Sequence, residues 1–99
     1  MHIITKRTLR KFWEKHPEAE NPLRSWYKVA DKTDWENMVD VRKDFPHADF
    51  AGICTIFNIG GNKYRLITKI SYRTRKIFVR FVLTHAEYNK GIYKNDCEC

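Results

Sequence analysis

The chain has 99 residues, a length that corresponds to one domain with one modest hydrophobic core. Lys and Arg outnumber Asp and Glu by 19 to 12, which gives a formal net charge of +7 spread from Lys6 to Lys94. Such a charge favours a polyanionic partner: RNA, DNA, an anionic membrane surface or an acidic protein. Hydrophobic residues make up 42% of the chain, which excludes a disordered tail.

The cysteines indicate the redox environment. There are three, Cys54, Cys97 and Cys99, and the last two lie at the end of the sequence. A secreted disulfide scaffold needs a denser pattern, and the sequence has neither a signal peptide nor an apolar run of the ~20 residues that a membrane helix requires. We therefore predict reduced cysteines, a cytoplasmic protein and no membrane association.

The first half of the chain has the periodicity of helices. A short β-type run at 2–4 is followed by Thr5, a candidate N-cap, and by a helix over roughly 6–16 with an apolar stripe. A second helix is predicted to begin near 21–22, where Asn and Pro suit the cap and the first turn. A third, shorter helix is predicted to begin near 33–34.

The second half of the chain alternates with period 2, as strands do. The predicted strands cover residues 50–57, 63–72 and 76–83 and are joined by turns. This order predicts an α+β fold, in which the N-terminal short strand and the helices pack on one face of a mostly antiparallel sheet that ends in a three-stranded meander. The other face is left to solvent or to a ligand.

The last residues contain a helix-start signal. Thr84 followed by Glu87 three residues later predicts a capping box and a single helical turn over 84–90. We predict a single domain over 1–90 and a C-terminal tail over 91–99.

Alternation also sorts the last two strands into an apolar and a cationic face. With the turn at 73–74, Ile67 faces Arg80, and Arg65 and Arg80 become diagonal neighbours. Two guanidinium groups held close together without an acid are unfavourable, and an anion between them removes the penalty. The predicted apolar face comprises Tyr64, Leu66, Thr68, Ile70, Ile77, Val79, Phe81 and Leu83, and the predicted cationic face comprises Lys63, Arg65, Ile67, Lys69, Phe78, Arg80, Val82 and Thr84. A surface that mixes apolar groups and cations suits nucleotides, because bases stack and phosphates pair with Arg.

Five separated stretches of the sequence form a recognisable pattern. Residues 2–5, 12–17, 58–65, 78–82 and 84–88 read HIIT, FWEKHP, NIGGNKYR, FVRFV and THAEY. In this order and spacing they resemble the HigB toxin family of type II toxin–antitoxin systems, over nearly the whole chain. The resemblance implies a RelE-like fold, an mRNA interferase that usually cuts mRNA in the ribosomal A site, and a partner antitoxin of the helix-turn-helix HigA type. The sequence NDCEC at its end departs from the family pattern.

RNA cleavage of this class would proceed by attack of the 2′-hydroxyl on the adjacent phosphate. It needs a base, cations at the charged intermediate and an acid at the leaving oxygen. We predict Arg65 and Arg80 as the phosphate clamp, with His85 and Tyr88 as acid, base or base-stacking groups. Alternatively, Arg80 holds the C-terminal segment by pairing with Glu87. The predicted RNA-binding residues are Lys63, Lys69, Asn62 and Phe78.

No metal or cofactor site is predicted. His2, His16 and His47 are assigned to an edge strand, a helix end and a loop, and no histidine has zinc-ligand spacing with a cysteine pair. The spacing between Cys97 and Cys99 is shorter than that of structural zinc sites.

Several alternatives stay open. The same cationic face suits a non-catalytic nucleic-acid-binding module or a domain that binds an acidic partner chain, and the same fold suits a ParE-like gyrase inhibitor. His85 is alternatively a cap residue bonded to backbone, and Tyr88 an aromatic that closes the end of the sheet.

Overall fold

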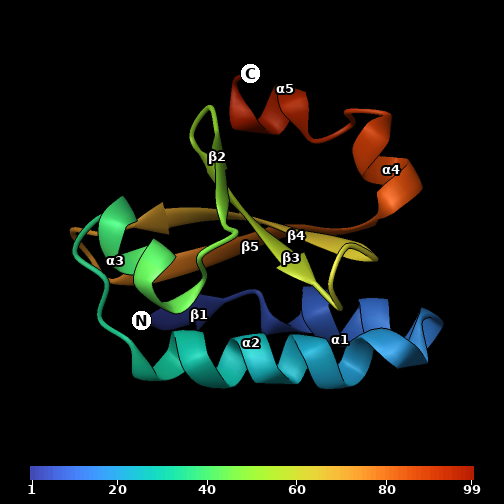
Figure 1. The fold of residues 1–99 in the computed structure, drawn as a ribbon, viewed down its shortest axis with the longest axis horizontal. Helices are drawn as coiled ribbons and strands as arrows, with labels where there is room; N and C mark the ends of the chain where they lie inside the picture. The colour runs from blue at the N-terminus through green and yellow to red at the C-terminus, as the bar shows by residue number, and fades with distance from the viewer.

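The computed structural model describes residues 1–99 and is built on one five-stranded sheet (Figure 1). Its strands are β1 (His2–Ile4), β2 (Asp49–Ala51), β3 (Cys54–Ile59), β4 (Tyr64–Ser71) and β5 (Lys76–Thr84). They are arranged in the order β1-β5-β4-β3-β2, and only β1 runs parallel to its neighbour. The predicted α+β class with a mostly antiparallel sheet is confirmed.

Two layers lie on opposite sides of this sheet (Figure 1). Helices α1 (Lys6–Lys15) and α2 (Glu20–Lys32) run side by side beneath it, joined by a 3₁₀ turn at Pro17–Ala19. Helices α4 (His85–Asn89) and α5 (Lys94–Cys97) lie on the other side with β2, and α3 (Met38–Asp44) lies at one end. None of these helices combines the length and the apolar character of a membrane span.

Helix α3 begins four to five residues later than the sequence predicts. The side chain of Asn37 caps it by accepting a hydrogen bond from the Asp40 N–H, and Thr33 closes the end of α2 by bonding the Ala30 carbonyl. Between them Trp35 is 2% exposed and stacks on Phe57 in the core. Burial of Trp35 therefore fixes the segment between α2 and α3. Helix propensity alone does not predict this burial.

The sheet carries apolar residues on both faces. The larger cluster packs between α1, α2 and the sheet, and its largest fully buried members include Leu9, Leu23, Trp26, Phe57, Leu66 and Ile77. The smaller cluster lies on the opposite face and consists of Cys54, Ile56, Ile67, Leu83, Tyr93 and Cys97. The expectation that this face is left open is therefore wrong over the area that the C-terminal segment covers.

A β-bulge in the pairing of β4 with β5 turns two residues of β5 toward this second cluster. Thr68 pairs with Val79, as the turn predicts, but Ile67 pairs with Phe81, so that Arg80 has no partner in the register. The predicted pairing of Ile67 with Arg80 is wrong, because a bulge inserts one extra residue and reverses the alternation beyond it. Phe81 and Leu83 consequently join the second cluster, and Val82 joins the core beneath the sheet.

The segment expected to be a tail is folded against the sheet. Tyr93 is 6% exposed and Cys97 is completely buried. Cys97 forms a disulfide with Cys54 across 43 residues of sequence, and only Cys99 is a free thiol. The expectation that all cysteines are reduced is therefore wrong for this pair. Spacing cannot reveal the pairing, because it depends on the return of α5 to within a Cα–Cα distance of 5.2 Å of β3.

Candidate active site

A pocket of about 400 Å³ opens where the start of β4, helix α4 and the loop after α3 meet. Its lining residues are Arg42, Pro46, His47, Ala48, Asp49, Ile56, Asn58, Arg65 and Tyr88. The predicted site residues Arg65 and Tyr88 thus meet here. The volume lies within the range of about 300–1,000 Å³ that is usual for ligand sites.

Arg65 is fixed by the β-turn that precedes it and by one aromatic ring. Its Nη1 donates to the carbonyl oxygens of Asn62, at 3.1 Å, and Tyr64, at 3.3 Å. The guanidinium carbon lies 5.1 Å from the centre of the Tyr88 ring. No protein acceptor bonds the Nε or Nη2 of Arg65, so these N–H groups are available to an anion.

Helix α4 places Tyr88 by the capping box that the sequence predicts. The Thr84 side chain accepts from the Glu87 N–H at 3.2 Å, and the Glu87 carboxylate accepts from the Thr84 N–H at 2.9 Å. The Tyr88 ring also stacks on Tyr93, with centroids 5.0 Å apart and an interplanar angle of 6°. Burial, and to a smaller extent the neighbouring Tyr88, raises the pKa of Tyr93 to about 12. The ring on which Tyr88 stacks therefore stays neutral.

The histidine that lines the pocket is His47, not His85. Both histidines are exposed, but only His47 lines the pocket, and the His85 backbone N–H donates to the Lys63 carbonyl at 3.1 Å. His47 is carried by a turn in which the Ala48 N–H bonds the Phe45 carbonyl. Nothing in the local sequence pattern singles out His47, because it lies in a loop that only the tertiary structure brings beside Arg65.

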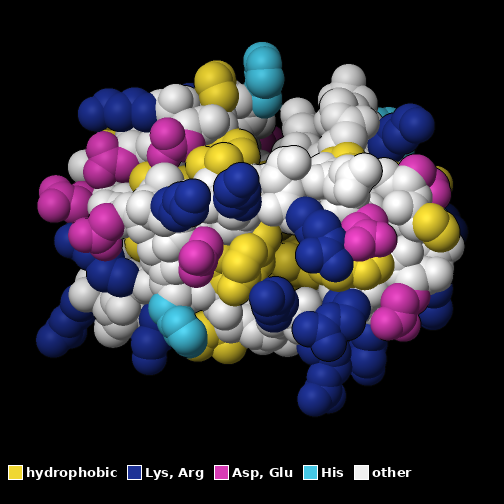
Figure 2. Space-filling model, turned by 90° about the horizontal axis from the view of Figure 1, so that it is seen from below, with side chains coloured by type: hydrophobic (Ala, Val, Ile, Leu, Met, Phe, Trp, Pro, Cys, Tyr) yellow, Lys and Arg dark blue, Asp and Glu magenta, His cyan; other side chains and the backbone are white.

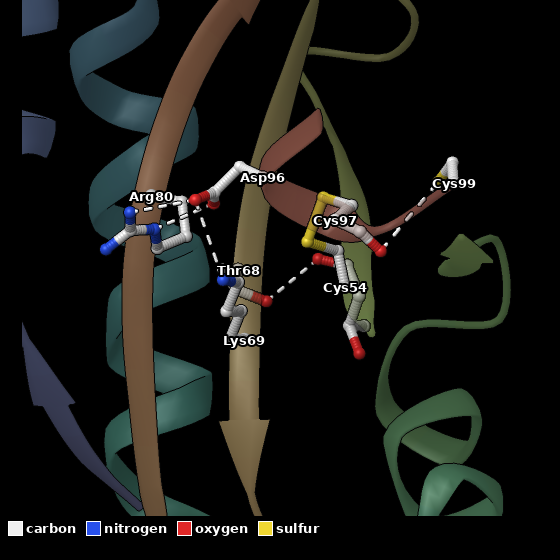
Figure 3. The surroundings of a disulfide bond; sticks show 8 residues. Cys54, Thr68, Lys69, Arg80, Asp96, Cys97 and Cys99 are labelled. Carbon is white, nitrogen blue, oxygen red and sulfur yellow. Dashed lines mark hydrogen bonds and ion pairs between the residues drawn. A yellow bond between two sulfur atoms is a disulfide. The ribbon is translucent and has the colours of Figure 1, made fainter. Parts of the chain in front are cut away.

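Arg80 lies in a different environment from Arg65. Its Nε and Nη2 donate to the two carboxylate oxygens of Asp96 at 2.9 and 3.0 Å, and Lys69 Nζ lies 3.6 Å from the same carboxylate (Figure 3). Arg80 therefore holds the C-terminal segment, as the alternative interpretation predicts, but through Asp96 and not Glu87. The Arg80 guanidinium lowers the pKa of Asp96, and Asp96 raises the pKa of Arg80.

The two arginines do not form one clamp. Arg65 pairs with Leu83, three residues beyond Arg80 on β5. At a rise of ~3.3 Å per residue, their positions are about 10 Å apart along the sheet. The predicted diagonal contact between them is therefore wrong, because of the bulge at Arg80.

The remaining predicted RNA-binding residues lie in separate places. Asn62 lines a second pocket of about 480 Å³ that shares Pro46, His47, Ala48 and Asn58 with the first. Lys63 is exposed and forms no ion pair. Phe78 is 36% exposed and pairs with Lys69 near the other end of the sheet.

Positive charge is not restricted to the surroundings of the pocket. Figure 2 shows the molecule from below, with Lys and Arg side chains spread over that face among fewer acidic ones. Helix α1 contributes Lys6, Arg7, Arg10, Lys11 and Lys15 against a single acid, Glu14. The helical layer is therefore a second basic surface.

Comparison with known proteins identifies the family. Residues 19–91 match a family model described as HigB_toxin, RelE-like toxic component of a toxin-antitoxin system. The chain is 32% identical over 93 residues to the mRNA interferase HigB of Escherichia coli O6:H1 (strain CFT073), which covers 91% of this chain and 90% of the relative. It is 28% identical over 92 residues to the mRNA interferase toxin HigB of Escherichia coli K12 and to the mRNA interferase HigB of Shigella flexneri, covering 90% of this chain and 88% of each relative. The chain belongs to the HigB family of RelE-like toxins of toxin–antitoxin systems.

Proposed function

We propose that this protein is an mRNA interferase, an endoribonuclease that cuts translated mRNA and is neutralised by a helix-turn-helix antitoxin of the HigA type. The names of its relatives support this activity. The observation that carries the proposal is the pocket in which an arginine with free N–H groups, a stacked tyrosine and an imidazole converge. An mRNA substrate implies that the protein acts in the cytoplasm.

We propose that Arg65 binds the scissile phosphate. The 2′-hydroxyl of the preceding nucleotide attacks phosphorus, the O2′–P bond forms, and the P–O5′ bond breaks. Negative charge increases on the non-bridging oxygens, and the free Nε and Nη2 of Arg65 suit them as donors. The products are a 2′,3′-cyclic phosphate and a free 5′-hydroxyl.

Two proton transfers accompany this step. A base accepts the proton of the 2′-hydroxyl, and an acid gives one to the leaving 5′ oxygen. We assign these roles to His47 and Tyr88, which line the pocket, and favour them over His85, which lies outside it. Lys63 then binds a phosphate farther along the RNA, and the basic face of α1 suits contact with ribosomal RNA.

The decisive test is transcript mapping after the protein is expressed alone. We expect growth arrest and new 5′ ends within translated mRNAs. Arg65→Ala should lower the cleavage rate about 100-fold, the usual effect of removing one donor to a charged intermediate. Arg73→Ala is the matched control, since Arg73 is exposed in the β4–β5 turn. Growth arrest with intact transcripts would favour a gyrase inhibitor and refute the proposal.

The two histidines are distinguished by a paired substitution. His47→Ala should reduce cleavage about 100-fold or more, because general acid–base groups contribute 10²–10⁴-fold. His85→Ala should reduce it less than about tenfold if its side chain does not transfer the proton. Cleavage of a defined RNA by each purified variant is the measurement, and the reverse order of effects would assign the role to His85.

A further inference from the structure

The carboxylate of Asp96 lies against both Arg80 and Lys69 (Figure 3). Asp96 accepts two parallel hydrogen bonds from Arg80 and lies 3.6 Å from Lys69 Nζ. Arginine binds phosphate with the same bidentate geometry. The Asp96 carboxylate thus makes the kind of contact with Arg80 that a phosphate group would make. The side chains of Lys69 and Arg80 remain 31% and 43% exposed, so the pair is accessible from solvent.

Three features hold Asp96 in this position. The next residue, Cys97, is bonded to Cys54 at the start of β3. The Cys97 carbonyl accepts the Ile53 N–H at 2.9 Å. A Cβ on Gly52 would lie only 1.9 Å from that carbonyl oxygen, so the turn before β3 accommodates α5 only because residue 52 is glycine. The C-terminal segment is therefore attached to the sheet through Cys97, and the adjacent Asp96 contacts the two cations.

We propose that Arg80 and Lys69 form a second phosphate-binding subsite for RNA, which Asp96 closes while the Cys54–Cys97 disulfide is intact and which opens when a dithiol reduces this bond. The inference rests on the proposed RNA substrate. Disulfides of cytoplasmic proteins commonly serve as redox sensors, since thiols there are kept reduced. An mRNA interferase with this bond would thus bind RNA more weakly under oxidising conditions.

The chemistry is thiol–disulfide exchange. A thiolate of the dithiol attacks one cystine sulfur and forms a mixed disulfide, and its second thiol then displaces the protein sulfur. Two electrons and two protons pass to Cys54 and Cys97, and the reductant leaves as its own disulfide. Both cysteines are buried, so α5, which has only four residues, opens before the exchange. Asp96 is then held by partly exposed ion pairs, which are weak by themselves.

The test measures binding without cleavage. The probe is a short 2′-O-methyl oligoribonucleotide, which lacks the attacking hydroxyl. Reduction of the wild-type protein with dithiothreitol should tighten its binding about threefold. It should also steepen the slope of log K against log salt by about 0.7–1.4, because one or two further phosphates are contacted at about 0.7 each. Asp96→Asn with the disulfide intact should reproduce both changes, and Arg80→Gln should abolish the response to reduction.

Two controls separate this mechanism from net charge and from other thiol effects. Glu98→Gln removes the same charge from an exposed neighbour that pairs with no cation, and Cys99→Ser removes the free thiol; neither should change probe binding. Equal effects of Asp96→Asn and Glu98→Gln would overturn the proposal. So would unchanged binding by reduced protein that circular dichroism shows to be folded. If reduction unfolds the protein, the Asp96→Asn comparison decides. Loss of the proposed function would appear instead as uncleaved natural RNA in a separate assay.

Discussion

At the scale of single residues, two glycines with similar backbone conformations have different roles. Gly52 and Gly61 have φ values of +58° and +70°, in the left-handed region that side chains rarely adopt. A Cβ at Gly61 would meet nothing within 4 Å, whereas one at Gly52 would collide with the Cys97 carbonyl. Gly61 is therefore required by its turn alone, and Gly52 by its turn and by the docking of α5.

This difference gives a matched pair of substitutions. Gly61→Ala should lower the free energy of unfolding by about 1–2 kcal/mol, the cost of a left-handed non-glycine residue. Gly52→Ala should cost more and should also release the C-terminal segment. Urea unfolding gives the free energies, and limited proteolysis reports the release. Equal losses of stability in the two variants would show that the contact with Cys97 contributes nothing.

At the scale of elements, two threonines precede helices, and only one acts as a side-chain cap. Thr84 forms the capping box of α4, as the sequence predicts. Thr5 occupies the N-cap position of α1, also as predicted, but its side chain makes no capping bond and its φ is +72°. Glycine adopts this conformation without a steric penalty, whereas threonine does not.

The two sites should consequently respond in opposite directions. Thr84→Ala should lower the free energy of unfolding by about 1 kcal/mol, the typical value of a lost N-cap. Thr5→Gly should raise it by about 1 kcal/mol, because it removes left-handed strain. Chemical denaturation of both variants is sufficient to test this. A loss of stability in Thr5→Gly would mean that the Thr5 side chain supports α1 in some other way.

At the scale of the whole molecule, a disulfide joins the two ends of the second cluster. It closes a loop across 43 residues that contains β3, β4, β5, α4 and α5. The chain-entropy relation assigns about 4 kcal/mol to a loop of that length, near the upper end of the typical range of about 2–4 kcal/mol. For a domain of this size such a contribution is a large share of a total stability of about 5–15 kcal/mol.

Breaking the bond should therefore lower the free energy of unfolding by about 2–4 kcal/mol. The Cys54→Ser, Cys97→Ser double variant and the reduced wild-type protein should show the same loss in urea denaturation. Cys99→Ser, which leaves the disulfide intact, is the control and should behave like the oxidised wild type. A reduced protein as stable as the oxidised one would show that the second cluster holds without the cross-link.

The sequence by itself determined the class of fold and the capping box at Thr84, because periodicity and cap signals are local. It also carried the family pattern that the comparisons confirm. Only the tertiary structure decided the bulge at Arg80, since Phe81, Val82 and Leu83 are all apolar and satisfy either alternation. It alone brought His47 to Arg65, and Asp96 and Cys97 to the sheet, because these contacts join segments far apart in the chain whose approach depends on packing.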